Sequence, residues 1–195
     1  RVGASSDRKF SILKKYKFYA DPFWLGENEI VIEALNKRTC KGEIIILGEN
    51  KESILINSSK YHFSYPSVIN YSNKTFVLPE MSSQNSQLCY ELKENKIFKS
   101  HQIRGFENIK LIDPTYLYYN NIHYIFGGIG KESNYRLYSW YCKGDWLKER
   151  FVEHPSNPIS VSPFGSRMAG AFIKQNGCLY RLGQNNTLSY GNGIV

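Results

Sequence analysis

The stretch Lys17-Phe18-Tyr19-Ala20-Asp21-Pro22-Phe23-Trp24-Leu25 decides the fold, because three altered copies of it follow. The copies are His62-Phe63-Ser64-Tyr65-Pro66-Ser67-Val68-Ile69, Lys110-Leu111-Ile112-Asp113-Pro114-Thr115-Tyr116-Leu117 and, more loosely, Gly165-Ser166-Arg167-Met168-Ala169-Gly170-Ala171-Phe172. We call these four stretches the markers. The steps between Asp21, Tyr65, Asp113 and Arg167 are 44, 48 and 54 residues. A repeat of this length is typical of an architecture built from similar units.

Each marker runs into an apolar or aromatic segment, a short polar turn and a second apolar segment. After the third marker, for example, the turn Asn120-Asn121 separates residues 115–119 from residues 122–126. Runs of β-branched and aromatic residues joined by turns of this kind predict hairpins. Later strands are expected in each unit: third strands at 43–47, 87–92, 136–140 and 188–190, and fourth strands at 53–57, 96–100 and 146–152.

Four strands in a unit of about 45 residues predict an all-β fold, a β-propeller of four-stranded antiparallel blades. A sandwich or a barrel would not require a marker before the first strand of each unit. We expect one domain, residues 1–195, with blade-like units at 18–60, 61–105, 108–155 and 164–195, and with residues 1–17 giving a strand to a closing blade. A four-bladed ring and an incomplete five-bladed ring both fit, and we expect the five-bladed type.

The composition narrows the classes of partner. The chain has 195 residues, a formal net charge of +8 and 15% aromatic residues. Its basic residues are scattered rather than clustered, so a solvated surface is favoured over a nucleic-acid interface. No run approaches the roughly 18 apolar residues of a membrane span, so no membrane insertion is expected. The aromatic residues suit packing between blades, and Tyr and Trp also suit stacking on sugars.

The cysteines and histidines form no recognisable metal or redox motif. The four cysteines fit no zinc spacing, and we expect buried or half-buried thiols in a reducing compartment, hence a cytoplasmic protein, with disulfides as the alternative. The four histidines are dispersed and are expected at the surface or in packing. We expect no metal and no cofactor. The chain starts at Arg1 without Met and ends on apolar residues, so we expect a piece of a longer protein.

Several short motifs in the markers and after them resemble a known family. These are Tyr19-Ala20-Asp21-Pro22-Phe23, Ser64-Tyr65-Pro66, Leu78-Pro79-Glu80, Leu111-Ile112-Asp113, Arg167-Met168-Ala169-Gly170, Leu179-Tyr180-Arg181, Gln184 and Tyr190-Gly191. Together they resemble the propeller domain beside the transferase domain of glucosamine inositolphosphorylceramide transferases, which also occurs in bacterial surface-polysaccharide proteins. The fold of that domain is related to five-bladed glycoside hydrolases such as arabinanases and levansucrases. The fourth marker departs from the family in having Met168 where Pro is frequent.

The resemblance implies a carbohydrate-associated domain with its site at the channel mouth. The implied partner is a glycan, a nucleotide sugar or a lipid-linked sugar, with a fused transferase domain outside this chain. Cleavage of a glycosidic bond needs two carboxyl groups that flank the bond. If the site is catalytic, we expect Asp21 as base or nucleophile, Glu80 as acid and Asp113 as the residue that tunes charge. The expected substrate-binding residues are Tyr65, Arg167, Gln184 and Trp24.

Structural roles remain open for the same residues. An Asp before Pro at a strand start often caps a turn by accepting backbone N–H bonds. Tyr65 also stands where a third acid would be expected, and Arg167 could simply pair with Asp21 or Asp113. Three hypotheses follow: a glycan-binding or donor-binding module of a glycan-assembly enzyme, a glycoside hydrolase or transglycosylase, and a protein-interaction scaffold.

Overall fold

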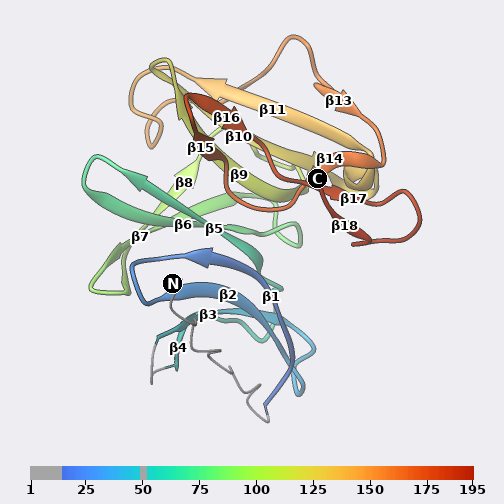
Figure 1. The fold of residues 1–195 in the computed structure, drawn as a ribbon. Coiled ribbons are helices and arrows are strands. Elements are labelled where there is room, and N and C mark those ends of the chain that lie inside the picture. Colours follow the sequence, from blue (N-terminus) through green and yellow to red (C-terminus); the bar gives the residue numbers. More distant parts are fainter. Residues whose placement is uncertain (1–14, 49–51) are drawn as a thin grey trace, which may run out of the picture.

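A computed structural model describes residues 15–48 and 52–195, and these form an all-β propeller with four blades (Figure 1). The first two blades are regular four-stranded antiparallel sheets in simple sequential order. The first contains β1 (Tyr16–Trp24), β2 (Ile30–Asn36), β3 (Gly42–Leu47) and β4 (Glu52–Ile56), and the second contains β5 (Ser64–Tyr71), β6 (Lys74–Glu80), β7 (Gln87–Lys93) and β8 (Lys96–Ile103).

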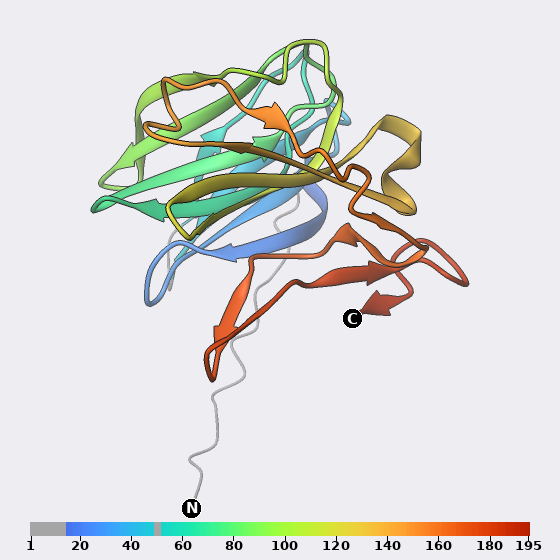
Figure 2. The ribbon, with the colours of Figure 1, turned by 90° about the horizontal axis from the view of Figure 1, so that it is seen from above.

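The third and fourth blades are less regular. The third has the order β12-β11-β10-β9, with β13 also paired to β11, and the fourth is divided into a β14-β17-β18 sheet and a β15-β16 hairpin. Viewed from above, the orange-to-red strands of the fourth blade lie along one side of the molecule (Figure 2). The bounds are β9 (Leu111–Tyr119), β10 (Ile122–Ile129), β11 (Arg136–Cys142), β12 (Val152–Glu153), β13 (Ser160–Val161), β14 (Phe164–Met168), β15 (Ile173–Gln175), β16 (Cys178–Tyr180), β17 (Gly183–Asn185) and β18 (Gly193–Ile194), with one 3₁₀ helix at Gly130–Asn134.

The hairpin turns follow from their Asn-rich sequences. Asn120 and Asn121 have φ angles of 49° and 60°, and Ser72 and Asn73 have φ angles of 51° and 58°. Two successive residues with positive φ match the right-handed twist of the flanking strands, and Asn tolerates this conformation better than most residues. The predicted hairpins β5-β6 and β9-β10 are therefore confirmed, with strand pairing that reaches the turn in both.

Two apolar clusters fix the arrangement of the blades. One lies between the second and third blades and includes the fully buried Trp140 and Trp146. The other joins the first, second and fourth blades through Phe23, Tyr65 and Met168. Because each cluster draws on more than one blade, the blades are held in a fixed orientation around the inner strands β1, β5, β9 and β14.

The structure corrects several expectations about the units. The five-bladed type is not confirmed, because the described residues form four blades. β1 already begins at Tyr16, whose ring is fully buried and whose hydroxyl donates to Glu43, so residues 16 and 17 belong to the first blade. The strand that residues 1–17 were expected to give to a closing blade otherwise falls on residues 1–14, which lie outside the described residues. Most of the strand expected at 146–152 is a turn that buries Trp146, and residues 188–190 form no strand.

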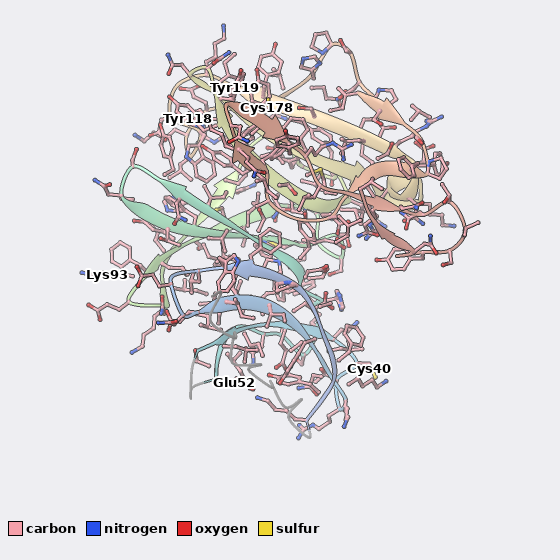
Figure 3. The ribbon with its side chains drawn as sticks, in the orientation of Figure 1. Cys40, Glu52, Lys93, Tyr118, Tyr119 and Cys178 are labelled. Atoms are coloured by element: carbon pink, nitrogen blue, oxygen red, sulfur yellow. The ribbon has the colours of Figure 1, made fainter. Side chains whose placement is uncertain are left out.

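The four cysteines are free, but only two are buried. Cys89 and Cys142 lie in the sheets, whereas Cys40 and Cys178 are exposed, contrary to the expectation of buried or half-buried thiols. Figure 3 shows Cys40 and Cys178 well separated, in the first and fourth blades. The expected cytoplasmic location stays a prediction. Within residues 15–48 and 52–195, no helix is long and apolar enough to cross a bilayer.

Candidate functional site

Three markers share one unusual backbone conformation. Asp21, Tyr65 and Asp113 have φ angles of 51°, 43° and 51°, and each precedes a proline. The pairing of each inner strand with its neighbour is irregular at this point, as in a β-bulge. A bulge redirects a side chain, and a positive φ in a residue other than Gly costs roughly 1–3 kcal/mol. The repeated strain identifies these three positions as candidates for a functional site.

The fourth marker departs from this pattern. The positive φ angle in β14 belongs to Gly165, at 87°, and not to Arg167. The pairing of β14 with β17 is again irregular, between Phe164 and Met168. Arg167 therefore comes from a different backbone geometry, and its long side chain rather than a bulge brings its charge to the other markers.

The four markers surround a pocket with a volume of about 620 Å³. Four carboxyl groups and one guanidinium line it, contributed by all four blades. The lining residues with polar or charged side chains are Asp21, Glu33, His62, Ser64, Glu80, Asp113, Arg167, Gln184 and Tyr190. Because residues of all four markers line it, this pocket is the mouth of the propeller channel predicted from the markers.

Arg167 is held by a dense set of acceptors. Its Nε and Nη2 donate to the two carboxylate oxygens of Asp113 at 2.6 and 3.4 Å. Its Nη1 donates to Asn134 at 2.8 Å and to Ser133 at 3.5 Å. The guanidinium carbon also lies 5.0 Å from the ring centre of Tyr190, within the range of a cation–π contact. Of the five N–H groups of an arginine, at most one remains free.

The buried Asp113 depends on this partner. Burial raises the pKa of Asp113, while the Arg167 guanidinium opposes the rise. For Arg167, burial alone would lower the pKa, but the nearby Asp113 outweighs it and the pKa is raised. A carboxylate that accepts two bonds from one guanidinium has a fixed orientation. Asp113 and Arg167 thus form a rigid pair at one wall of the pocket.

Both carboxylate oxygens of Glu80 accept hydrogen bonds from neighbouring residues. Oε1 accepts a hydrogen bond from the hydroxyl of Ser82 at 2.9 Å, and Oε2 accepts one from the backbone N–H of Asp113 at 3.1 Å. The second bond crosses from the second blade to the third. Because both oxygens act as acceptors, the orientation of the Glu80 side chain is fixed.

Glu33 occupies the same structural position in the first blade as Glu80 in the second. Glu33 pairs with Ala20 and Glu80 pairs with Ser64, each the residue just before a strained marker. Glu33 is 5% exposed, and burial together with the neighbouring carboxylates of Asp21, Glu80 and Asp113 raises its pKa to about 8. At neutral pH the geometry therefore favours a Glu33 side chain that keeps its proton.

His62 faces Glu33 across the pocket wall. Its Nδ1 accepts a hydrogen bond from the backbone N–H of Gly42 at 2.8 Å, so in the neutral ring the proton is on Nε2. Nε2 lies 3.5 Å from Oε1 of Glu33. Burial lowers the pKa of His62 below its ordinary value. A neutral His62 adds no positive charge to the pocket.

Asp21 is the carboxylate of the pocket with the fewest contacts to other side chains. Within the described part of the chain its side chain has no hydrogen-bond partner, and it is half-buried rather than buried. Burial raises its pKa, Arg167 lowers it and Glu80 raises it further. Of the four carboxyl groups, Asp21 is therefore the one best placed to contact a bound molecule directly.

The structure brings together five of the seven residues expected at the site. Asp21, Glu80, Asp113, Arg167 and Gln184 all line the pocket. Gln184 donates to the carbonyl of Met168 at 3.3 Å, while its own Oε1 is buried and has no partner in residues 15–48 and 52–195. The pocket location fits the expected roles of these residues, and the roles themselves stay predictions.

Tyr65 lies beneath the pocket and not in it. The residue is 1% exposed, and its hydroxyl bonds to Thr115 Oγ1 and to the N–H of Gly170, both at 2.9 Å. Its ring packs edge-on against Phe23. Tyr65 is absent from the lining of the pocket, and its contacts with Thr115, Gly170 and Phe23 are those of a core residue, so its expected role in substrate binding gains no support.

Trp24 is placed away from the pocket as well. It is 72% exposed and lies at the end of β1, where it lines a separate cavity with Phe23 and Leu47. In a strand, three residues span roughly 10 Å, which carries Trp24 away from Asp21 along β1. The expected contact between Trp24 and a substrate at this site is not supported.

Glu33, His62 and Tyr190 are the pocket residues that sequence reasoning missed or left aside. The sequence places Glu33 near the position in the first unit that Glu80 has in the second, with a structural role favoured, and the hairpin register confirms this place opposite Ala20. His62 stands in the second marker and Tyr190 in a family motif, but neither stretch assigns its residue to the pocket, because each reaches it from an irregular segment. No group of three or more His, Cys, Asp or Glu side chains in the described part of the chain is arranged to hold a metal ion.

Solved structures with similar folds include a glycoside hydrolase and a galactanase. A thermostable family-43 glycoside hydrolase superposes with a TM-score of 0.62 at 9% identity, covering 92% of this chain and 67% of that one. An exo-β-1,3-galactanase from Phanerochaete chrysosporium, solved with galactose, superposes with a TM-score of 0.55 at 7% identity, covering 80% and 39%. At these identities the likeness shows the fold alone.

Sequence comparisons identify the family. Glucosamine inositolphosphorylceramide transferase 1 from Arabidopsis thaliana is 28% identical over 91% of this chain, and the protein of that name from Oryza sativa subsp. japonica is 27% identical over 91%. The chain spans about 25% of the length of these relatives. The family model described as glucosamine inositolphosphorylceramide transferase 1, N-terminal, matches residues 8–195. The chain therefore belongs to the family of these N-terminal propeller domains.

Proposed function

We propose that the pocket binds the sugar part of a glycan or glycolipid, as the recognition domain of a larger glycan-assembly enzyme. The observation that carries the proposal is the pocket itself, where four carboxyl groups, a fixed arginine and Gln184 converge from four blades. Sugar hydroxyls donate hydrogen bonds, and carboxylates are acceptors that suit them. The relatives named as glycolipid transferases and the glycoside hydrolase fold support a carbohydrate context.

A binding experiment tests this proposal. The chain would be screened against immobilised glycans, and hits would be measured by calorimetry with the Asp21→Asn variant and an Asp145→Asn control. Asp145 lies on an exposed turn, where it pairs with Lys148, so the control removes the same charge far from the pocket. We expect Asp21→Asn to weaken binding at least tenfold and the control to leave it unchanged. Absence of binding to every glycan would contradict the proposal.

A second function, glycoside hydrolysis or transglycosylation, is favoured by one specific observation. Asp21 is a carboxylate without a partner in the described residues, and Glu33 beside it holds its proton because its pKa is about 8. A base or nucleophile and an acid are the two groups this chemistry needs. In this reading Asp21 keeps its expected role, and Asp113 orients Arg167. Glu33 is a better acid than Glu80, because both oxygens of Glu80 already accept hydrogen bonds.

Turnover distinguishes the two functions. If the pocket is catalytic, Glu33→Gln should reduce release of sugar from a bound glycan at least a hundredfold, while Glu80→Gln should act mainly through stability. If the pocket only binds, the unmodified chain will retain a glycan without changing it. Product analysis by mass spectrometry after overnight incubation decides between these results.

We also infer a larger context for the domain. A fused transferase domain outside this chain fits the relatives, of which the chain spans a quarter. A five-bladed ring in the complete protein is supported by the exposed apolar side chains of the fourth blade, such as Leu179 and Ile194, which a further blade would cover. A structure of the full-length protein with only four blades would overturn this part.

A further inference from the structure

Basic side chains that are spread along the sequence gather at one end of the first blade. Two precede or begin β1 and three lie in the turn between β2 and β3, and we call these five residues the basic patch: Lys15, Lys17, Lys37, Arg38 and Lys41. All are exposed except the half-buried Lys41. The fold thus clusters charges that look scattered in the sequence.

Contacts between the two segments hold the basic patch together. The backbone N–H of Lys37 donates to the carbonyl of Lys15 at 2.9 Å, and Nζ of Lys17 lies 3.9 Å from Sγ of Cys40. Figure 3 shows Cys40, which belongs to the same turn, at the periphery of the first blade. Leu35, two residues before Lys37, lines the pocket, so the basic patch lies beside the mouth of the channel.

Most of the basic patch has no acidic partner. Glu52 pairs with Lys15 at 3.4 Å, and the buried Glu43 accepts hydrogen bonds from Tyr16 and Asn36 beneath the patch. Within the described residues, no carboxyl group forms an ion pair with the other four cations. Five cations against two carboxyl groups leave an excess of three positive charges on this small surface.

A second group of lysines has a structural explanation that the basic patch lacks. Lys93, Lys96 and Lys99 are exposed at the end of β7 and along β8, the outermost strand of the second blade. Lysine on an edge strand prevents pairing with another sheet. That reason does not apply to the three cations in the turn between β2 and β3.

The composition and position of the basic patch indicate its partner. Four of its five cations are lysines, which are compact charges on flexible stems and lack the planar fork with which arginine holds one fixed phosphate or carboxylate. Clusters of roughly four to eight basic residues are typical of surfaces that bind anionic lipids. A nucleic acid or an acidic polypeptide crossing the patch would extend toward the four carboxyl groups of the neighbouring pocket.

We propose that the basic patch docks the domain on a bilayer surface that carries anionic lipids, through the charge of these lipids and not through one particular headgroup. The contact is peripheral, because the lysine side chains meet the lipids at the headgroup level. The inference goes beyond the proposed function and does not depend on it, since the patch and the pocket use different residues.

Sedimentation with lipid vesicles tests the inference. The chain of 195 residues would be mixed with vesicles of phosphatidylcholine alone, or with roughly one-third phosphatidylglycerol or phosphatidylserine. We expect binding to the two anionic compositions to agree within about threefold and to exceed binding to neutral vesicles at least tenfold. Binding should fall at least tenfold between about 0.05 and 0.5 M salt, because salt screens exposed charges.

A triple variant locates the binding in the basic patch. Lys17→Gln/Lys37→Gln/Arg38→Gln should weaken binding to anionic vesicles at least twentyfold, because each basic residue near such a surface contributes about fivefold. All three side chains are exposed, so the unfolding midpoint should not change.

The lysines of the second blade provide the matched control. Lys93→Gln/Lys96→Gln/Lys99→Gln removes the same charge and should weaken binding by no more than about threefold. Figure 3 shows Lys93 on the opposite side of the molecule from Cys40. Equal losses in the two variants would overturn the inference, because net charge alone would then account for binding.

Three further results would also overturn it. These are equal binding to neutral vesicles, a clear preference for one anionic headgroup, and tighter binding to an oligonucleotide or to polyglutamate than to anionic vesicles at the same salt concentration. None of these results bears on sugar binding in the pocket, so the two proposals can fail separately.

Discussion

Tyr65 in the second blade and Asp113 in the third occupy the same place in neighbouring blades. Both have a positive φ, both precede a proline and both lie at a bulge of the inner strand. Yet Tyr65 turns its hydroxyl into the core, to Thr115 and Gly170, whereas Asp113 faces the pocket and binds Arg167. The comparison teaches that the repeated marker determines a backbone shape, while the residue type determines whether the position supports the frame or the site.

The largest expected effect is on the free energy of unfolding, and it comes from Tyr65. Tyr65→Ala should lower the free energy of unfolding by about 3–5 kcal/mol, because it leaves a cavity in the core and removes two buried hydrogen bonds. Urea unfolding measures the change. Tyr119→Ala is the matched control, since Tyr119 points outward from the end of β9 and should cost less than about 0.5 kcal/mol (Figure 3). Similar losses in both variants would remove the distinction drawn for Tyr65.

The next largest effect on stability is expected from the pair of Arg167 and Asp113 in the pocket. Arg167→Ala should cost about 3 kcal/mol at neutral pH, because it leaves the carboxylate of Asp113 buried without its counter-ion. The loss should shrink as the pH falls, since a protonated Asp113 needs no cation. Unfolding midpoints of the variant and the unmodified chain between about pH 5 and 8 measure this. An Arg167→Ala defect that does not change with pH would show that the pair contributes through packing alone.

Substitution of Glu33 should have a smaller effect, and it should raise the stability at high pH rather than lower it. Its pKa of about 8 in the fold lies above the ordinary 4.5, so the stability it contributes is complete at low pH and is lost as the pH rises toward 8. Glu33→Gln removes this dependence and should make the protein more stable than the unmodified chain at about pH 8.5, by about 2 kcal/mol.

Glu91, a carboxylate outside the pocket, provides the control for this pH dependence of stability. Glu91 on β7 pairs with Lys74 on β6 and with His101 on β8, and these contacts lower its pKa. Glu91→Gln should therefore lose stability at pH 8 and recover as the pH falls. Parallel pH profiles of the two variants would contradict the different environments assigned to Glu33 and Glu91.

The smallest effect is expected at Trp24. Because this side chain is exposed and lies outside the pocket, Trp24→Ala should change neither the free energy of unfolding by more than about 0.5 kcal/mol nor the affinity for a pocket ligand by more than twofold. Calorimetry with any glycan found in the screen measures the second quantity. A larger loss of affinity would extend the binding site along β1 to the opposite end of the strand.

The repeat was readable because propeller blades place similar residues at similar steps. The markers, the hairpin turns at Asn73 and Asn121 and the convergence of Asp21, Asp113 and Arg167 follow from period and turn chemistry. The role of Tyr65 was not readable, since a marker position does not reveal which way a bulge directs its side chain. The fourth blade was misjudged at 188–190, because these residues lie in a bend and turn between β17 and β18, and these two strands complete the sheet.

The origin of Arg167 has one more consequence. The guanidinium that orders Asp113 comes from β14, so the third and fourth blades must dock before the pocket is electrostatically complete. Assembly of the ring and competence to bind are thus thermodynamically linked. Any molecule that enters the pocket and contacts Arg167 or Gln184 would stabilise the docked position of the fourth blade. The melting temperature of the protein would then rise with the concentration of that molecule. A thermal-shift measurement with such a molecule would then also measure how strongly the fourth blade is held against the third.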